Sequence, residues 1–326
     1  MRPRAAFHAK QAWFSLKGEE IIRVRFFDSR GTYPKGKITL PSGFFYADES
    51  LAVLVTKGHS WHYYIEDCGF DEFESPFPAE ASFMGSMILC ENMDGPSVRF
   101  YLLNTPVFLL DPLTVDITSS GSQEEVIALI RDHSNWPNRN YVNRFERLPP
   151  GEFQLIEQDA LDLEQLQGTW ENIRPNDFIL LRGLVSLFKS DMLSNHREFG
   201  AEALMSLYVA LECSFQLVLQ QLKSRGNLNP TASDAARWLH DTFDQHWNFE
   251  EPDPAYKYFQ EFYEGRVMMF HPRSRFGDLP YAPNFWGDVI HLRRSLPNIF
   301  FYLVNGEHSK SFIESVAEFC SKQSAI

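Results

Sequence analysis

Two side chains near residue 270 could act together on a phosphate ester. Arg266 and His271 lie in the stretch EGRVMMFHPRS, with four residues between them. A guanidinium can hold two phosphate oxygens at once, and a histidine with an unperturbed pKa of about 6.5 can accept or donate a proton at neutral pH. The two side chains together could therefore bind an anionic group and transfer a proton to or from it.

The pattern around the pair predicts one amphipathic helix. Asp253 is its expected N-cap, Pro254 lies in its first turn, and it should end at His271 because Pro272 disfavours a helical residue before it. Apolar and aromatic residues recur at spacings of three and four: Phe259, Phe262, Tyr263, Val267 and Phe270. Arg266 lies within this stripe, so it must be paired, reach solvent or be kept for an anion.

Arg266 and His271 should not meet on an isolated helix. Five residues correspond to about 140° of rotation and roughly 7.5 Å of rise, so the two side chains flank a pocket more readily than they touch. A second copy of the helix, related by a two-fold axis, would bring each pair near its symmetry mate and form one composite cleft. The pattern therefore predicts a homodimer.

The sequence on both sides of the motif is also informative. The stretches LYVALECSFQLVLQQL and YEGRVMMFHPRSRFG, with an Arg and a His at the end of the penultimate large helix of a predicted bundle, resemble the R-x4-6-H signature and its surroundings in the Apea-like branch of the HEPN superfamily. The resemblance covers roughly residues 170 to 326. It implies a metal-independent endoribonuclease that acts as a dimer, leaves a 2′,3′-cyclic phosphate and uses Arg266 and His271. The family's association with phage defence and toxin modules implies abortive infection or growth arrest.

Four further residues are expected to support the pair. Arg273 and Arg275 lie just beyond the predicted helix end, where they could guide the RNA backbone. Tyr263 lies one turn before Arg266 and could orient it or stack on a base. Glu212 shares a face of an earlier predicted helix with apolar residues, and its expected partner is Arg266. That ion pair would position the guanidinium if it is incompletely buried and would silence it if it is tight.

Other interpretations of the motif remain open. Arg266 could be a paired core arginine, and His271 a helix-terminal histidine favoured by the helix dipole. Active HEPN motifs usually carry a polar residue directly after the Arg, and many carry a glycine after the His, whereas this chain has Val267 and Pro272. The alternative function is a non-catalytic HEPN adaptor that dimerises and binds nucleotide, RNA or a partner protein.

The overall charge restricts how RNA could bind. The formal net charge of −13 disfavours broad, non-specific binding to nucleic acid. Basic residues are concentrated in residues 1–37, with nine Lys/Arg against three Asp/Glu, and in residues 265–277, with three Arg and no acid. RNA, either tRNA or mRNA, is therefore expected at a confined place. A regulatory protein or a phage-derived trigger is a further candidate partner.

Several other classes of protein lack their sequence signals here. The chain contains no glycine-rich phosphate loop, no H-E-x-x-H and no G-x-S-x-G. Cys68, Cys90, Cys213 and Cys320 show no C-x-x-C spacing, so neither a zinc site nor a disulfide framework is predicted. No metal or cofactor is expected. No apolar run reaches the length of a membrane span, and the N-terminus lacks the apolar core of a signal peptide. The expected location is cytoplasmic, without a membrane partner.

The two halves of the chain differ in pattern and predict an α+β protein. Residues 1–150 are expected to form a β-rich domain, a sandwich or partly open barrel, that senses a trigger or steers substrate. Residues 151–326 are expected to form an all-α HEPN-like bundle. The length suits two domains, and residues 135–150, rich in Asn, Arg and Pro, are the expected linker.

Individual elements follow from the hydrophobic periodicity and the turn residues. Strands are expected at residues 20–27, 36–40, 43–47, 51–56, 60–65, 86–89, 98–103 and 113–117. Helices are expected at residues 120–136, 177–195, 199–223, 234–243, 284–304 and 309–322, in addition to the helix that carries Arg266. The helix at 120–136 is expected to pack on the edge of the sheet.

Overall fold

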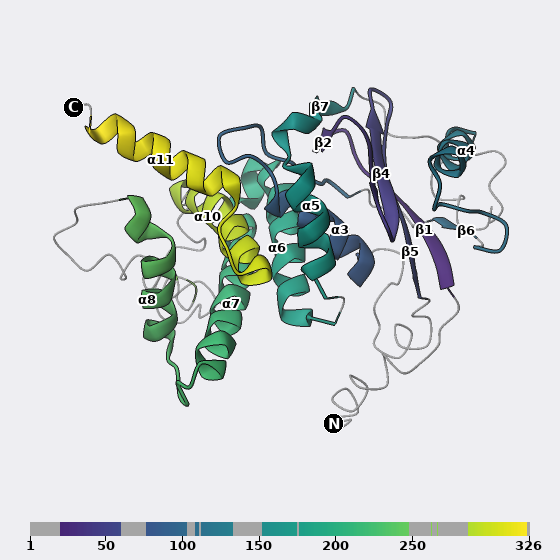
Figure 1. The fold of residues 1–326 in the computed structure, drawn as a ribbon. Helices are drawn as coiled ribbons and strands as arrows, with labels where there is room; N and C mark the ends of the chain where they lie inside the picture. The colour runs from purple at the N-terminus through teal and green to yellow at the C-terminus, as the bar shows by residue number, and fades with distance from the viewer. Residues whose placement is uncertain are drawn as a thin grey trace.

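The structure is a computed structural model of the chain. It describes residues 20–59, 76–102, 108–110, 112–132, 152–174, 176–247, 262, 266 and 286–324. The elements of these residues form an α+β fold, with most strands in the N-terminal part and a mostly helical second half (Figure 1). This confirms the expected fold class.

The largest sheet has five strands, and all neighbouring strands run antiparallel. Its order is β3-β4-β5-β1-β6, with β1 at Glu20–Phe26, β3 at Gly36–Leu40, β4 at Gly43–Asp48, β5 at Leu51–His59 and β6 at Phe108–Leu110. At the β3–β4 turn only a glycine fits at position 43, because a Cβ there would lie 2.0 Å from the carbonyl oxygen of Val55. A separate two-stranded parallel sheet pairs β2 (Thr32–Pro34) with β7 (Gln154–Ile156).

One face of the five-stranded sheet is covered by α4 (Ser120–Arg131), as Figure 1 shows. Alternate residues of β1 face this helix, because side chains of a strand alternate between the two faces. The buried cluster on this side contains Ile22, Val24, Phe26, Phe44, Val53, Val55, Ile117, Val126, Ile127 and Ile130. The helix therefore packs on a face of the sheet rather than on its edge, which corrects the sequence expectation.

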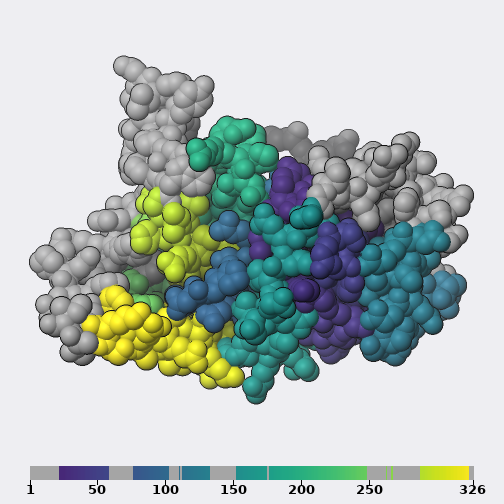
Figure 2. All heavy atoms as spheres, turned by 90° about the horizontal axis from the view of Figure 1, so that it is seen from above, coloured from purple at the N-terminus to yellow at the C-terminus, as the bar shows by residue number. Residues whose placement is uncertain are grey.

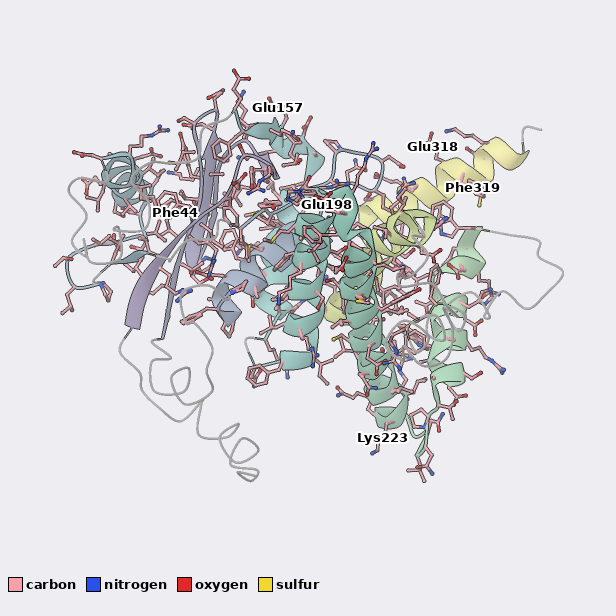
Figure 3. The ribbon with its side chains drawn as sticks, turned by 180° about the vertical axis from the view of Figure 1, so that it is seen from behind. Phe44, Glu157, Glu198, Lys223, Glu318 and Phe319 are labelled. Atoms are coloured by element: carbon pink, nitrogen blue, oxygen red, sulfur yellow. The ribbon has the colours of Figure 1, made fainter. Side chains whose placement is uncertain are left out.

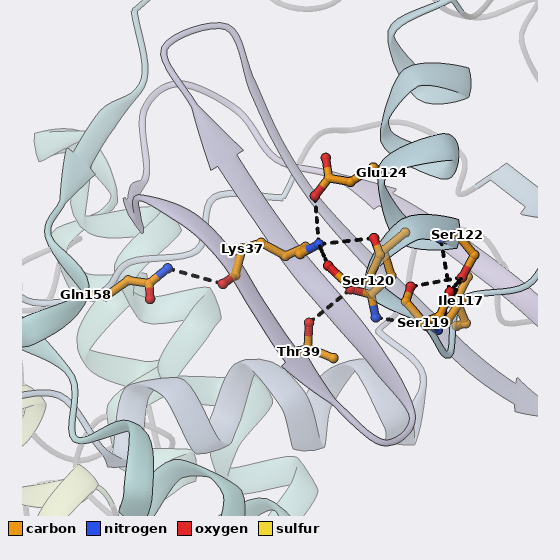
Figure 4. Close-up of polar contacts among 9 residues, drawn as sticks. Lys37, Thr39, Ile117, Ser119, Ser120, Ser122, Glu124 and Gln158 are labelled. Atoms are coloured by element: carbon orange, nitrogen blue, oxygen red, sulfur yellow. Dashed lines mark hydrogen bonds and ion pairs between the residues drawn. The ribbon is translucent and has the colours of Figure 1, made fainter.

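Polar contacts fix the position of α4 over β3 (Figure 4). Lys37 donates to Glu124 Oε1 at 2.7 Å and to Ser120 Oγ at 2.9 Å, and Thr39 donates to Gln123 at 3.0 Å. Ser119 caps the helix by accepting from the amide of Ser122. These contacts join residues that are more than 80 positions apart in the sequence.

The other face of the sheet packs against α3 (Pro78–Leu89), which contacts β5. The further helices are α5 (Leu163–Asn172), α6 (Phe178–Ser194), α7 (Gly200–Ser224), α8 (Ala232–Thr242), α10 (Trp286–Asn305) and α11 (Lys310–Ser324), with 3₁₀ turns at Gln158–Ala160, Arg197–Phe199 and Asp244–Trp247. Asp177 and Thr231 cap α6 and α8 through their side chains.

α7 is the central helix of this group. It packs against α6, α8 and α10, and Figure 3 shows Glu198 and Lys223 near its two ends. Within the described ranges, Arg197–Ser224 is the one helical segment long and apolar enough to cross a membrane, and 56% of its apolar window is buried inside the protein. Packing against its neighbours accounts for the apolar side chains of α7.

A single apolar core runs from the sheet into the helices. Phe27, Tyr33 and Phe45 of the N-terminal part belong to the same buried cluster as residues of α6, α7 and α10. At the junction the rings of Phe100 and Phe188 are 6.1 Å apart and edge-to-face. The predicted domain boundary near residue 150 lies outside the described residues and stays a prediction.

Several predicted elements differ from the structure. Residues 86–89 lie in α3, residues 98–102 form only isolated bridges, and residues 113–117 form a turn and irregular backbone, while β6 is at Phe108–Leu110. The strand prediction at residues 86–89 is wrong because α3 is buried on all sides from Glu80 to Leu89, so its sequence shows no helical alternation of apolar and polar residues.

The sheet arrangement also differs from the expectation. Among the described residues there is one five-stranded sheet with helices on both faces, rather than a sandwich or barrel. β2, β7 and α5 were not expected. α4 ends at Arg131, five residues before the predicted end at residue 136. The predicted strand at residues 60–65 lies outside the described residues. The remaining strands and helices predicted within the described ranges are confirmed to within a few residues.

Glu80 is expected to be essential for stability. Its carboxylate is fully buried and accepts from Arg23 Nε at 3.0 Å and Arg25 Nε at 2.8 Å. Replacing Glu80 with Gln removes the negative charge that both buried guanidiniums contact, and we expect the free energy of unfolding to fall by roughly 3–5 kcal/mol. Urea unfolding at neutral pH measures this change. Glu125→Gln, an exposed carboxylate on α4, is the control and should change stability little.

Acid should act on the same group. Burial alone would raise the pKa of Glu80, but the charges of Arg23 and Arg25 outweigh it, so the pKa is lowered. A lowered pKa stabilises the fold fully above the unfolded-state value of about 4.3, and this stabilisation is lost as the pH falls through the folded-state pKa. Below a pH of about 4.3, the free energy of unfolding of the wild type should therefore fall more steeply than that of Glu80→Gln. Parallel acid profiles of the two proteins would contradict this role.

Gly183→Ala is expected to destabilise the fold although alanine favours helices. A Cβ at Gly183 would lie 2.5 Å from Cζ of Phe300 and 3.2 Å from Cβ of Cys213, at the packed contact of α6 with α10 and α7. Overpacking of this kind costs about 1–3 kcal/mol. Gly168→Ala is the matched control, because nothing lies within 4 Å of the added Cβ on α5. Thermal unfolding should show a lower midpoint for Gly183→Ala alone; equal midpoints would show that the α6–α10 contact can relax.

Candidate functional site

The structure brings Arg266 and Glu212 together. Nη1 of Arg266 lies 3.2 Å from Oε2 of Glu212, which α7 carries. The two residues are far apart in the sequence, and α7 positions the carboxylate. The partner that the sequence suggests for Arg266 is therefore in place.

The ion pair is only partly shielded from solvent. The side chains of Arg266 and Glu212 are 24% and 28% exposed. Gln216, one turn along α7, donates from Nε2 to Glu212 Oε1 at 3.0 Å. The carboxylate is thus held by a neutral amide on one oxygen and faces the guanidinium with the other. This arrangement orients Arg266, and the exposed part of the ion pair does not include Arg266 Nε or Glu212 Oε2, which are both buried.

Phe262 anchors the segment that carries Arg266. Both residues are helical, and Phe262 is partly buried against the main core one turn before the arginine. Residues four apart lie on one side of a helix, so Phe262 and Arg266 share a face.

Two further titratable side chains, Tyr208 of α7 and Asp288 of α10, interact near Glu212. Tyr208, one turn before Glu212, is buried, and burial together with the charge of Asp288 raises the pKa of its hydroxyl to about 12. Burial also raises the pKa of Asp288, against the opposing effect of His291. Tyr208 therefore stays neutral at physiological pH, and the start of α10 adds a carboxyl group that the sequence did not indicate.

The remaining predicted site residues lie outside the described part of the chain. These are Tyr263, His271, Arg273 and Arg275. Their places relative to Arg266 and to a second copy of the chain stay predictions.

The two buried thiols are poor nucleophiles. Cys213 follows Glu212 on α7, and burial raises the pKa of its thiol to about 11. Burial likewise raises the pKa of Cys90 to about 12. A thiol that is protonated at neutral pH is a weak nucleophile and a weak metal ligand. In the ranges that the structure covers, no group of three His, Cys, Asp or Glu residues could hold a metal ion.

A second polar cluster, which the sequence pattern does not predict, surrounds Arg293. Arg293 of α10 bonds Asp191 of α6 at 2.8 Å and Glu91 at 3.0 Å, next to a cavity between these segments. The signal was present, since Arg293 is surrounded in sequence by apolar residues at helical spacing, as Arg266 is. Nothing in the sequence indicates its partners, because they lie 102 and 202 positions away.

No protein-family model, curated protein or solved structure is significantly similar to the chain. The resemblance to Apea-like HEPN proteins therefore rests on the residues of this chain alone.

Proposed function

We propose that the chain is a metal-independent endoribonuclease of the HEPN type, acting at a site that two copies of the chain form together. The observation that supports this most directly is the environment of Arg266. An arginine within an apolar stripe is held by Glu212 yet keeps 24% of its side chain exposed. A purely structural ion pair gains little from such exposure, because solvent screens it.

In the proposed reaction the 2′-oxygen of RNA attacks the adjacent phosphorus. His271 of one copy removes the 2′-hydroxyl proton, a P–O2′ bond forms, and the bond from phosphorus to the 5′-oxygen breaks. The symmetry-related histidine, in its protonated form, supplies the proton that the leaving 5′-oxygen takes. Arg266 stabilises the negative charge on the non-bridging oxygens. The products are a 2′,3′-cyclic phosphate and a 5′-hydroxyl.

Glu212 acts in this proposal by positioning Arg266. A long arginine side chain loses considerable rotamer freedom when it holds one geometry, and a pre-existing carboxylate contact removes part of that loss before RNA binds. Partial exposure keeps the contact weak enough for a phosphate to compete. Of the two roles that the sequence left open for this ion pair, the exposure favours positioning.

The proposed substrate is RNA, either tRNA or mRNA, bound at a confined site. The net charge of −13 requires a local attraction rather than an extended basic surface. Residues 265–277 supply three Arg and no acid for this purpose. A role in phage defence or toxin-like growth arrest, triggered by a regulatory protein or a phage component through the β-rich part, rests on the family resemblance alone.

Substituting either member of the pair should abolish cleavage. We expect the purified chain to cut tRNA or total RNA in EDTA, and His271→Ala or Arg266→Ala to lower the rate by about 10²–10⁴-fold, the usual contribution of a proton-transfer group. Gel analysis of the RNA and detection of cyclic phosphate ends measure this. His240→Ala is the matched control, since His240 lies half-buried on α8 beside the exposed Asp241.

The oligomeric state of the same samples distinguishes the two candidate functions. Absent cleavage, or equal cleavage by wild type and His271→Ala, together with a dimer in sedimentation, would support the adaptor instead. A monomer at micromolar concentration would count against a composite site.

Glu212→Gln should separate positioning from stability. The amide keeps the shape but loses the charge, so we expect the cleavage rate to fall about tenfold while stability changes by less than about 1 kcal/mol, as for other partly exposed ion pairs. Glu202→Gln, at an exposed position of the same helix, should leave both unchanged. A faster Glu212→Gln enzyme would show instead that the carboxylate restrains Arg266.

A further inference from the structure

A cavity of about 580 Å³ lies between α6, α10 and the segment after α3. Its apolar lining comes from residues such as Ile88, Met93 and Val289. Figure 2 shows the blue atoms of the segment that includes residues 76–102 beside the yellow-green atoms of α10. The volume is within the range of sites for small organic molecules.

The inner wall of the cavity carries a buried ion cluster. Arg293 donates from Nε to Asp191 Oδ1 at 2.8 Å, from Nη1 to Glu91 Oε1 at 3.0 Å and from Nη2 to the carbonyl of Val98 at 3.1 Å. The side chains of Arg293, Asp191 and Glu91 are 9%, 5% and 11% exposed. Two carboxylates thus share one guanidinium, and the cluster lacks one positive charge.

Two polar atoms of this wall have no hydrogen-bond partner among the described residues. They are Oδ2 of Asp191 and the hydroxyl of Ser190, and the two residues are 4% and 1% exposed. Both residues line the cavity. A buried carboxylate oxygen without a donor is unfavourable, so a cationic donor from a ligand would complete the cluster. Burial raises the pKa of Glu91 despite Arg293, in keeping with this missing charge.

The rim of the cavity has the opposite charge. Arg99 and Arg294 line it, are exposed, and make no ion pair within the described ranges. Asp94, also at the rim, is already occupied by the hydroxyl of Ser315 at 2.7 Å. The cavity therefore presents free acceptors at its wall and free guanidiniums at its mouth.

We infer that this cavity binds a small zwitterion, a molecule with a primary ammonium group and a carboxylate or phosphate group. The ammonium donates to Asp191 Oδ2 and to the oxygen of Ser190, and it supplies the charge that the cluster lacks. The anionic group bonds Arg99 and Arg294, whose planar guanidiniums suit carboxylate and phosphate oxygens alike. This site uses α6 and α10 and is independent of the proposed cleavage at Arg266.

Calorimetric titration of the full chain tests the class of ligand. The probes are γ-aminobutyrate, L-glutamate and phosphoethanolamine. The control compounds are n-butylamine, which has only the ammonium group, butyrate, which has only the carboxylate, and AMP, which has a phosphate but no primary ammonium group. We expect saturable binding of at least one zwitterion with a Kd below about 1 mM, and at least tenfold weaker binding of n-butylamine and butyrate. A carboxylate zwitterion that binds better than phosphoethanolamine identifies the anionic group, and the reverse order identifies a phosphate.

Variants locate the binding. Ser190→Ala removes a hydroxyl that has no partner in the described structure, and it should weaken the best zwitterion about five- to tenfold without loss of folding. Arg99→Ala with Arg294→Ala should weaken it at least tenfold, while Arg225→Ala, an exposed arginine at the end of α7, should not. Asp191→Asn should abolish binding. If Asp191→Asn does not fold, Ser190→Ala still tests the site.

Four results of these titrations would contradict the inference. No heat with any of the three zwitterions, equal binding of butyrate or n-butylamine, or binding of AMP alone would overturn it. So would zwitterion binding that survives both Ser190→Ala and the double arginine variant. Because the readout is binding, its result does not depend on whether the protein cleaves RNA.

Discussion

The burial of Arg293 is the constraint on which much of the helical half depends. A guanidinium that is 9% exposed must be neutralised where it lies, and its counter-ions come from α6 and from the segment after α3, 102 and 202 positions away in the sequence. These bonds fix α10 against α6 and against residues 91–98. α7 packs against both of these helices, so the position of Glu212, and through it the orientation of Arg266, follows from the same frame.

Arg266 and Arg293 show that one sequence pattern can lead to two physical outcomes. Both are arginines among apolar residues at helical spacing. Arg293 is enclosed by two carboxylates and a carbonyl, whereas Arg266 pairs with Glu212 and keeps 24% of its side chain exposed. Enclosure makes the first arginine structural and gives the cavity beside it an acidic wall. The second keeps part of its side chain exposed, and the proposed cleavage requires that it exchange Glu212 for a phosphate.

The sequence was informative where apolar runs were bounded by clear turn residues. The strands of the β3–β4–β5 meander follow from short apolar and aromatic runs between turn residues, and α6 and α8 follow from apolar residues at helical spacing. It failed at α3, because a helix buried on all sides has no polar face to mark its period. Glu212 could be proposed as the partner of Arg266 because both interrupt apolar faces. The cavity could not be proposed, since Glu91, Asp191 and Arg293 meet only through the tertiary fold.

The shared core limits how the β-rich part could influence the helices. Phe27 and Phe45 belong to the same buried cluster as Leu184 and Leu211, and Phe100 packs edge-to-face on Phe188. Separating the two parts as rigid bodies would expose these aromatic and aliphatic surfaces to water, at about 25 cal/mol for each Å² of apolar area. A hinge opening between them is therefore unfavourable. A signal from the sheet would have to pass through small shifts of packed side chains and of α3, which lies between β5 and α6 and contacts both.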